Sequence, residues 1–369
     1  MVVSLDICTE IMSQKIHNFN AGPSTLPNEI FKKTSNAILN LNESGLSILE
    51  ISHRSNEFKD ILSEARELVL KIAKLDSNEY SSLFLQGGAS TQFLMIAYNF
   101  LNYNAGYINT GSWATKAMQE ARLFGNVIEL ASSNDKNYNY IPKNYNIQDD
   151  LDYIHLTTNN TIYGTQFDLI PDFNQSLIAD MSSDIFSRDI DYSVFDLFYA
   201  GAQKNLGPAG TTLVVIKKEI LEKIKREVPS ILSYKVHIDK DSSFNTPPIF
   251  SIYACLLNLK EIRIKGIKRI ESENNTKANA LYDEIDRNTC FYGFAENEDR
   301  SKMNVTFNLK DNNNSEIFEK ICKENGIIGV NGHRSVGGYR ASLYNALNIE
   351  SVKVLINCMK EAESSINKK

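Results

Sequence analysis

Three separate stretches of the sequence hold residues whose types and positions could do chemistry. The first is a glycine-rich turn over 86–92, Gln-Gly-Gly-Ala-Ser-Thr-Gln, which follows an apolar run and precedes a helical pattern over 93–101. Small residues let backbone N–H groups approach an anion at a helix N-terminus, whose partial positive charge favours phosphate. The turn therefore predicts a phosphate site, although a plain tight turn accounts for its glycines equally well.

The second stretch places an acidic residue at the end of an apolar run. Asp180 follows the run 176–179 and precedes Met181-Ser182-Ser183. Open α/β sheets bind their ligands at the carboxyl ends of their strands, so this position suits a functional carboxylate. An exposed helix N-cap is the alternative, and the sequence does not decide between the two.

The third stretch puts a lysine among small residues. Lys204 lies between the apolar runs 197–200 and 211–216, with glycine and alanine on both sides of it. A single lysine is usually a solvated surface residue, but so many small neighbours suit a backbone against which something flat must lie. We therefore favour a functional Lys204.

Taken in order, the three stretches match the requirements of pyridoxal phosphate (PLP). A lysine amine condenses with the PLP aldehyde, an aspartate holds the pyridine nitrogen protonated, and a helix N-terminus takes the phosphate. Motifs of other chemistry are missing from the sequence: G-x-x-x-x-G-K-[ST], G-x-G-x-x-G after a strand, H-E-x-x-H and G-x-S-x-G. The five His are too dispersed to reveal a metal site.

These residues need a fold that brings strand ends together. Two helical patterns near 26–41 and 58–72 are followed by seven short apolar runs, several separated by helical stretches: 82–85, 106–109, 127–130, 153–156, 176–179, 197–200 and 211–216. This order predicts an α/β fold with a mainly parallel seven-stranded sheet and helices on both faces. A long helical pattern over 249–286 then leads to a smaller α+β unit, with strands at 303–309 and 339–343 and helices at 315–325 and 349–365.

The predicted domains are a loose N-terminal tail (1–15), a large PLP-binding domain (16–265) and a small C-terminal domain (266–369). A chain of 369 residues exceeds what one core needs, which agrees with two units.

Composition limits the partners and the compartment. The 39 Lys and Arg and 45 Asp and Glu give a net charge of −6, so nothing attracts the whole molecule to nucleic acid or anionic lipid. The five scattered Cys form no Cys-x-x-Cys pair, which favours a reducing compartment over a disulfide framework. No export signal or membrane-length apolar stretch is seen. We expect a cytoplasmic enzyme without nucleic-acid or membrane partners.

The chain resembles the phosphoserine aminotransferase family, part of the class V aminotransferases of PLP fold type I. The resemblance covers nearly everything after residue 15, from the Phe-Asn-Ala-Gly-Pro of 19–23 to the stretch 332–346. Its most specific stretches occur in family order: Ile51-Ser52-His53-Arg54, Asp180-Met181-Ser182-Ser183, Ala200-Gly201-Ala202-Gln203-Lys204-Asn205 and Phe244-Asn245-Thr246-Pro247-Pro248.

The resemblance implies a transaminase of serine biosynthesis that converts 3-phosphooxypyruvate and L-glutamate to O-phospho-L-serine and 2-oxoglutarate. A phosphorylated hydroxythreonine of vitamin B6 synthesis is a further candidate substrate. Lys204 is implied as the Schiff-base lysine and proton carrier, and Asp180 as the partner of the pyridine nitrogen. The other implied cofactor contacts are Trp113 on the ring, Thr161 near the phenolic oxygen, and Ala89, Ser90 and Gln203 at the phosphate.

The resemblance also implies an obligate homodimer with shared active sites, because Asn245 and Thr246 reach the phosphate from the second subunit. Arginine forks bind carboxylate and phosphate oxygens through two hydrogen bonds, and histidine adds further donors. Recognition of the two small-molecule substrates is therefore implied for two His-Arg pairs: His53, Arg54, His333 and Arg334. Some relatives carry Arg where this chain has Ser90, so phosphate binding depends more on the other contacts.

Two alternatives remain open. Another aminotransferase or a desulfurase of the same fold would use alanine, serine or cysteine, but no Cys lies beside the recognised stretches. A non-catalytic cofactor-binding regulator would lack the intact Lys204 and Asp180 and would carry a basic DNA-binding appendage, which a net charge of −6 does not supply.

Overall fold

The computed structural model describes residues 15–334 and 336–368, so the predicted tail lies outside the described residues except for Lys15. Its largest layer is a seven-stranded sheet in the order β2-β8-β7-β6-β5-β3-β4. The strands are β2 (Tyr80–Leu85), β3 (Asn104–Asn109), β4 (Asn126–Ser132), β5 (Tyr153–Thr157), β6 (Leu177–Asp180), β7 (Leu197–Gly201) and β8 (Thr212–Lys217). β8 pairs antiparallel with both neighbours and every other pair is parallel. The predicted mainly parallel α/β sheet is confirmed.

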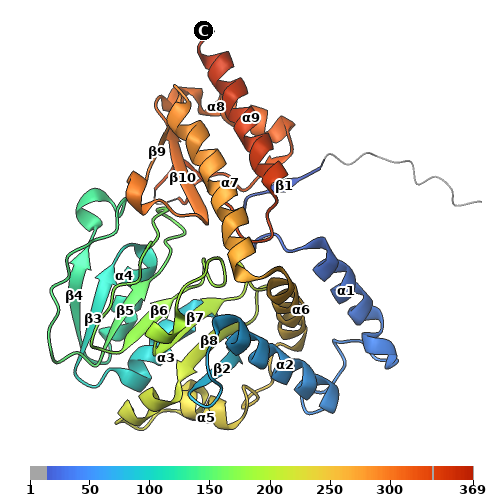
Figure 1. Ribbon diagram of the computed structural model, residues 1–369, viewed down its shortest axis with the longest axis vertical. Coiled ribbons are helices and arrows are strands. Elements are labelled where there is room, and N and C mark those ends of the chain that lie inside the picture. The colour runs from blue at the N-terminus through green and yellow to red at the C-terminus, as the bar shows by residue number, and fades with distance from the viewer. Residues whose placement is uncertain (1–14, 335, 369) are drawn as a thin grey trace, which may run out of the picture.

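Successive residues of a strand point to opposite sides of the sheet. Both sides are apolar here, so helices cover both faces. Phe198 belongs to the core on one face, with α2 (Asn56–Ala73) and α6 (Ile249–Lys265). Tyr199 belongs to the core on the other face, with α3 (Gly88–Phe100) and α4 (Ser112–Ala121). Figure 1 shows this layered arrangement, with α1 (Asn28–Leu39) to one side and α5 (Tyr234–Asp239) below.

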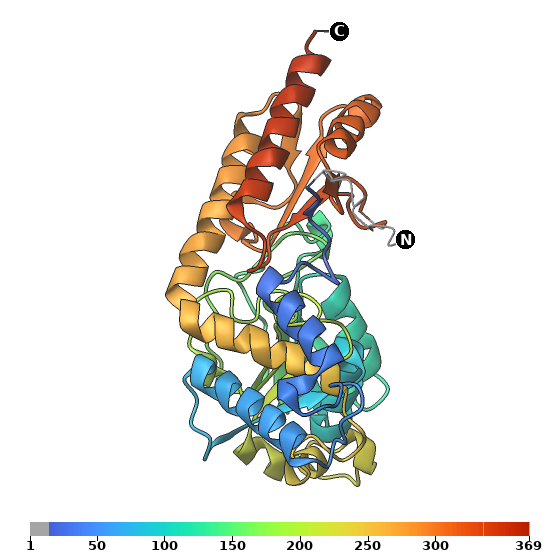
Figure 2. The same ribbon diagram turned by 90° about the vertical axis from the view of Figure 1, so that its right-hand side faces the viewer.

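The long helical pattern over 249–286 forms two helices rather than one. α6 ends at Lys265 and α7 (Ile267–Arg287) begins two residues later. The intervening Gly266 has φ +79°, a left-handed backbone conformation that glycine adopts without strain. Figure 2 shows the chain turning there and α7 running on into the second unit.

The second unit is a three-stranded antiparallel sheet packed against helices. β10 (Asn304–Leu309) lies between β12 (Tyr339–Ser342) and β9 (Phe291–Gly293), and the helices are α8 (Ser315–Glu324) and α9 (Ile349–Ile366). A short strand near the start of the chain, β1 (His17–Asn18), pairs with β11 (Ile327–Ile328), and Phe19 is fully buried in this second core. The first described residues therefore pack with the C-terminal unit, while the domain boundaries remain a prediction.

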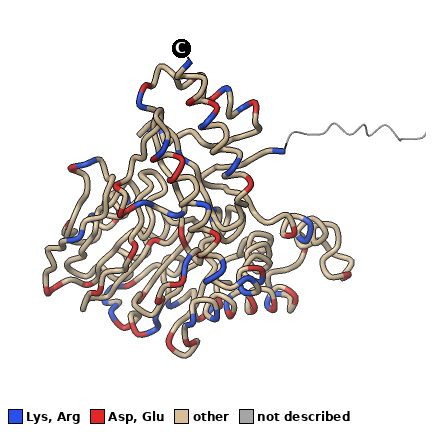
Figure 3. Tube along the Cα trace, turned by 45° about the horizontal axis from the view of Figure 1, so that its top comes forward, with Lys and Arg blue, Asp and Glu red and all other residues tan. Residues whose placement is uncertain are grey.

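The surface carries both signs of charge. Figure 3 shows Lys and Arg interspersed with Asp and Glu along the chain. Within residues 15–334 and 336–368, no helix has the length and apolar character that a membrane span requires.

Candidate active site

Lys204 lies in the loop that joins β7 to β8. This loop is closed by backbone hydrogen bonds, with Ala202 N donating to Thr211 O at 3.1 Å and Gly207 N donating to Ala202 O at 2.8 Å. A Cβ on Gly207 would stand 2.6 Å from Cys255 Sγ of α6. Gly207 is therefore required by its packing against α6. The sequence suggests a different reason for small residues here, namely room for a flat ligand.

The segment after β1 fixes the lysine backbone from the other side. Ser24 N donates to Gln203 O at 3.0 Å, and Ser24 Oγ donates to Lys204 O at 2.5 Å. A Cβ on Gly22 would come within 3.4 Å of the side chains of Gln203 and Lys204. The segment that contains Gly22 and Ser24 therefore helps to position Lys204.

The Lys204 amine is buried and hydrogen-bonded. Its Nζ donates to Thr161 Oγ1 at 2.7 Å and lies 5.9 Å from the centre of the Trp113 ring. Burial lowers its pKa to about 8; the negative charge of Asp180 works against this shift, and Arg340 adds to it. An amine with such a pKa is neutral, as a nucleophile must be, in a far larger fraction of molecules near neutral pH than an ordinary lysine.

Asp180 lies at the carboxyl end of β6 with 4% of its surface exposed. Its Oδ1 accepts a hydrogen bond from Ser182 N at 2.9 Å, and Ser182 Oγ accepts one from Gly201 N at 3.1 Å. Burial raises the pKa of Asp180, and Ser182 and Lys204 oppose the shift. The alternative of an exposed helix N-cap is wrong, because the carboxylate is buried and closes a turn.

The glycine-rich turn opens α3, as the sequence predicts. Gly87 precedes the helix at φ +96°, no side chain caps the first turn, and that turn holds no acidic residue. Its N–H groups are therefore available to an anion. Ala89 is half-buried and Ser90 is exposed within this turn.

Asn245 and Thr246 lie beside the same turn within one chain. Asn245 Nδ2 donates to Gln86 Oε1 at 2.9 Å, and Gln86 Nε2 donates to Thr246 O at 2.8 Å. Both residues also line a pocket of about 550 Å³ with His53 and Arg54. Four of the predicted site residues are thus brought together, in a pocket whose lining does not include Lys204.

The second His-Arg pair lies in another place. His333 and Arg334 are exposed on the loop before β12. Burial lowers the pKa of His333, with further lowering by the charges of Arg340 and Lys116. Lys116 is close enough to affect His333, and its ammonium lies 4.7 Å from the centre of the Trp113 ring. His333 and Arg334 therefore lie on the Trp113 side of the site.

Sequence reasoning missed Arg340, which projects from β12 to the lysine. Its Nη1 donates to Thr161 O at 3.2 Å, its Nε has no hydrogen-bond partner in the described chain, and its charge lowers the pKa of Lys204. The only sequence feature that could have indicated a role for Arg340 was its positive charge within the predicted strand 339–343.

The donor set fits PLP. The site combines a buried amine at Lys204, a buried carboxylate at Asp180 and an uncapped helix start at α3. Trp113 is half-buried, and its ring Nε1 is buried without a hydrogen-bond partner among the described residues. Such an unpaired polar atom is costly unless a bound group satisfies it.

Comparisons with known proteins agree with this chemistry. The family model described as Aminotransferase class-V matches residues 16–355. The phosphoserine aminotransferase of Flavobacterium psychrophilum is 56% identical over 95% of this chain and 100% of its own length. That of Bacteroides thetaiotaomicron is 52% identical over 95% of this chain and 99% of its own length.

Solved structures of very similar fold are also phosphoserine aminotransferases. The phosphoserine aminotransferase from Bacillus circulans subsp. alkalophilus superposes with a TM-score of 0.93 at 41% identity, covering 96% of this chain and 100% of that one. A phosphoserine aminotransferase studied for radiation damage of its Schiff base gives a TM-score of 0.93 at 42% identity, over 95% of this chain and 99% of that one. The chain belongs to the class V aminotransferases, within their phosphoserine aminotransferase family.

Proposed function

We propose that the chain is a PLP-dependent transaminase that moves the amino group of L-glutamate to 3-phosphooxypyruvate, forming O-phospho-L-serine and 2-oxoglutarate for serine biosynthesis. The observation that carries the proposal is the buried Lys204 amine, held by Thr161 and lying within the electrostatic influence of Asp180. Full-length relatives at 50–56% identity that are named phosphoserine aminotransferases support the choice of substrates.

When bound, PLP supplies an aldehyde that links to amines and a ring that accepts an electron pair. The neutral Lys204 amine would condense with that aldehyde with loss of water, and once displaced by the substrate amine it would take the proton from the substrate α-carbon as general base. Thr161 orients the amine by accepting its hydrogen bond. Asp180 keeps the pyridine nitrogen protonated, since a buried carboxylate is stabilised by a cationic partner.

The phosphate and the ring need separate contacts. We assign the phosphate to the first turn of α3, with the Ala89 and Ser90 amides, and to Gln203, which precedes the lysine. The free N–H groups and the positive end of the helix dipole favour that anion. Trp113 stacks on the ring and can donate its unpaired Nε1–H.

Arginine and histidine side chains hold the substrate anions. Arg340 binds the α-carboxylate, because its guanidinium is beside Lys204 and its Nε–H is unpaired among the described residues. His333 and Arg334 on one side, and His53 and Arg54 on the other, take the substrate phosphate and the distal carboxylate of glutamate.

A homodimer with shared sites explains why these anion-binding groups lie apart in one chain. The pocket of His53, Arg54, Asn245 and Thr246 is lined without Lys204, which supports a site in which one copy brings this pocket to the lysine of the other. Apolar surface near α1 is available for such a contact: Phe31, Leu39, Leu46 and Leu49 are each at least half exposed.

Residues 16–265 bind PLP, and residues 266–369 supply Arg340, His333 and Arg334. A reducing cytoplasm suits the described cysteines, which are buried free thiols: Cys255, Cys290, Cys322 and Cys358. Their burial also weakens the desulfurase alternative, which needs an accessible thiol.

The test is a direct assay. Purified protein with PLP, L-glutamate and 3-phosphooxypyruvate should release 2-oxoglutarate, and Lys204→Ala should release none above background. Replacing 3-phosphooxypyruvate by pyruvate, glyoxylate or hydroxypyruvate tests the choice of acceptor. A wild-type protein that prefers one of these acceptors would contradict the proposal.

A further inference from the structure

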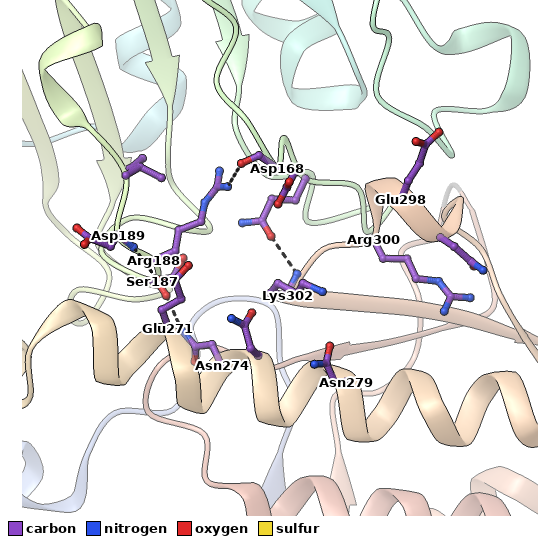
Figure 4. Close-up of a pocket in the computed structure, with 14 residues that line it drawn as sticks. Asp168, Ser187, Arg188, Asp189, Glu271, Asn274, Asn279, Glu298, Arg300 and Lys302 are labelled. Atoms are coloured by element: carbon purple, nitrogen blue, oxygen red, sulfur yellow. Dashed lines mark hydrogen bonds between the residues drawn. The ribbon is translucent and has the colours of Figure 1, made fainter.

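A polar pocket of about 370 Å³ lies away from the proposed active-site residues, between the large sheet and the second unit. Figure 4 shows its walls, which come from the segment between β5 and β6, from the loop after β6, from α7 and from the segment that leads into β10. Its lining includes five charged residues and a buried carboxamide: Asp168, Arg188, Glu271, Glu298, Lys302 and Asn274.

The walls of this pocket are fixed by hydrogen bonds between its elements. Asn274 Nδ2 of α7 donates to Ser187 O at 3.0 Å, and Lys302 N donates to Gln166 Oε1 at 3.0 Å. Asp189 N donates to Glu271 Oε2 at 3.3 Å. A ligand would therefore enter a largely preformed space, which reduces the entropy cost of binding.

Several polar groups of the lining lack partners in the part of the chain that the structure describes. The Oδ1 of Asn274, a residue with 2% of its surface exposed, accepts no hydrogen bond, and Arg188 Nε donates none. The half-buried Lys302 and the exposed carboxylates of Asp168 and Glu298 add charges that form no ion pair among the described residues. Buried polar atoms without a partner, such as the Asn274 Oδ1 and the Arg188 Nε, are rare in folded proteins and call for a bound polar molecule.

The mixture of charges restricts the ligand. A simple anion would meet the carboxylates of Asp168, Glu271 and Glu298, and a simple amine would meet the cations of Arg188 and Lys302. A metal ion is disfavoured because the described residues contain no group of three His, Cys, Asp or Glu that could hold one. A molecule with both charges close together satisfies both sets of groups.

We propose that this pocket binds a small polar α-amino acid as its zwitterion, and that occupancy acts on the active site through Arg188. The ligand carboxylate faces Lys302 and Arg188, and its ammonium faces the unpaired carboxylates and the Asn274 carbonyl oxygen. Carboxamides in the lining, including Asn275 and Asn279, suit a hydroxyl or amide side chain on the ligand.

A chain of contacts leads from the pocket to the proposed catalytic residues. Arg188 Nη2 lies 3.6 Å from Asp184 Oδ2, and Asp184 accepts a hydrogen bond from Thr158. The Thr158 hydroxyl also contacts Asp180 O at 3.2 Å. A carboxylate that competes for Arg188 therefore changes the charge balance beside Asp180 and Lys204. This second half of the proposal rests on the proposed function.

Calorimetric titration of the holoenzyme with L-serine and L-asparagine tests the site. We expect one binding event per chain for at least one of them, with no change in the absorbance of the Lys204-bound cofactor. Ethanolamine and succinate, which each carry a single kind of charge, should bind at least tenfold more weakly. Equal binding of these probes, or no heat with either amino acid, would overturn the proposal.

Two matched variants locate the binding event. Lys302→Met should weaken binding at least tenfold while leaving the basal transaminase rate unchanged, and Lys310→Met, at an exposed lysine of the same unit, should do neither. In the wild type, the initial transaminase rate should change over the same range of amino-acid concentration in which the calorimeter detects binding. In Lys302→Met, the rate should not change over that range. Unaltered binding in Lys302→Met would refute the site, and an unaltered wild-type rate at saturation would refute the link through Arg188. Because binding is read without turnover, a failed transaminase assay would count against the proposed function alone.

Discussion

The chemistry assigned to Lys204 depends on two opposing influences on one amine. Burial and the charge of Arg340 favour the neutral form, and the carboxylates of Asp180 and Asp184 favour the charged form. The result is a pKa of about 8, low enough for nucleophilic attack and high enough for the amine to hold a proton that it has removed.

Covalent uptake of PLP by the apoprotein should therefore accelerate as pH rises through about 8, because only the neutral Lys204 amine attacks the aldehyde. Arg340→Met removes a charge that lowers this pKa, so the midpoint should move to higher pH. Stopped-flow absorbance during PLP uptake measures both midpoints, with Arg122→Met at an exposed position as the control. A wild-type midpoint near 10.5, the ordinary lysine value, would contradict the electrostatic account.

Asp180→Asn should retain bound PLP but lose roughly 10²-fold or more in kcat, because the neutral amide no longer stabilises the protonated ring nitrogen. Cofactor content is measured by absorbance and kcat by 2-oxoglutarate release. Asp149→Asn, an exposed aspartate, should behave like the wild type. If Asp180→Asn kept a wild-type kcat, the carboxylate would have no part in the chemistry.

At the scale of elements, a buried lysine attaches α7 to the segment that follows β12 in the second unit. Lys277 Nζ donates to the carbonyl oxygens of Leu343, Tyr344 and Leu347 at 2.8, 2.8 and 3.0 Å. These carbonyls belong to the segment that runs from β12 to α9. The lysine thus fixes the strand that carries Arg340 against α7.

Lys277→Met should lower the free energy of unfolding by about 3 kcal/mol, because it leaves buried carbonyl oxygens without a donor. Urea denaturation followed by circular dichroism measures the loss. Lys268→Met, on the exposed side of the same helix, should change stability by no more than about 0.5 kcal/mol. Similar losses in the two variants would show that these three hydrogen bonds contribute little.

How well the sequence predicts an element depends on whether its pattern is local. The seven sheet strands are predictable because each contains a short, mainly apolar run, which is continuous over much of β8. β1 and β11 are only two residues long and form through pairing across 310 positions, which no local pattern reveals. The break at Gly266 has a visible glycine, but helices tolerate isolated glycines, so the residue alone does not end the pattern.

The same reasoning separates the site residues. Asp180 and Lys204 are predictable because Asp180 ends one buried strand and Lys204 follows the next, and sheets place ligands at these strand ends. Arg340 lies within a strand, so its approach to Lys204 depends on how the second unit packs against the sheet. Tertiary packing of this kind cannot be inferred from spacing along the chain.

At the scale of the whole molecule, the proposed dimer makes a sharp prediction about mixed subunits. Lys204→Ala and Arg54→Ala homodimers should each be nearly inactive. If Arg54 serves the lysine of the other subunit, heterodimers regain one complete site, so random pairing restores about a quarter of the sites. Co-expression with two affinity tags isolates the heterodimer for assay. Activity that never exceeds that of Arg54→Ala alone would place both residues in a single-chain site.

The most direct test of the account is the identity of the residue that carries the cofactor. Borohydride reduction of the resting holoenzyme, followed by proteolysis and mass spectrometry, should find the reduced cofactor mass on the peptide that contains Lys204. The label should be missing from Lys204→Ala. Cofactor mass on a different lysine, or on none, would contradict the central claim.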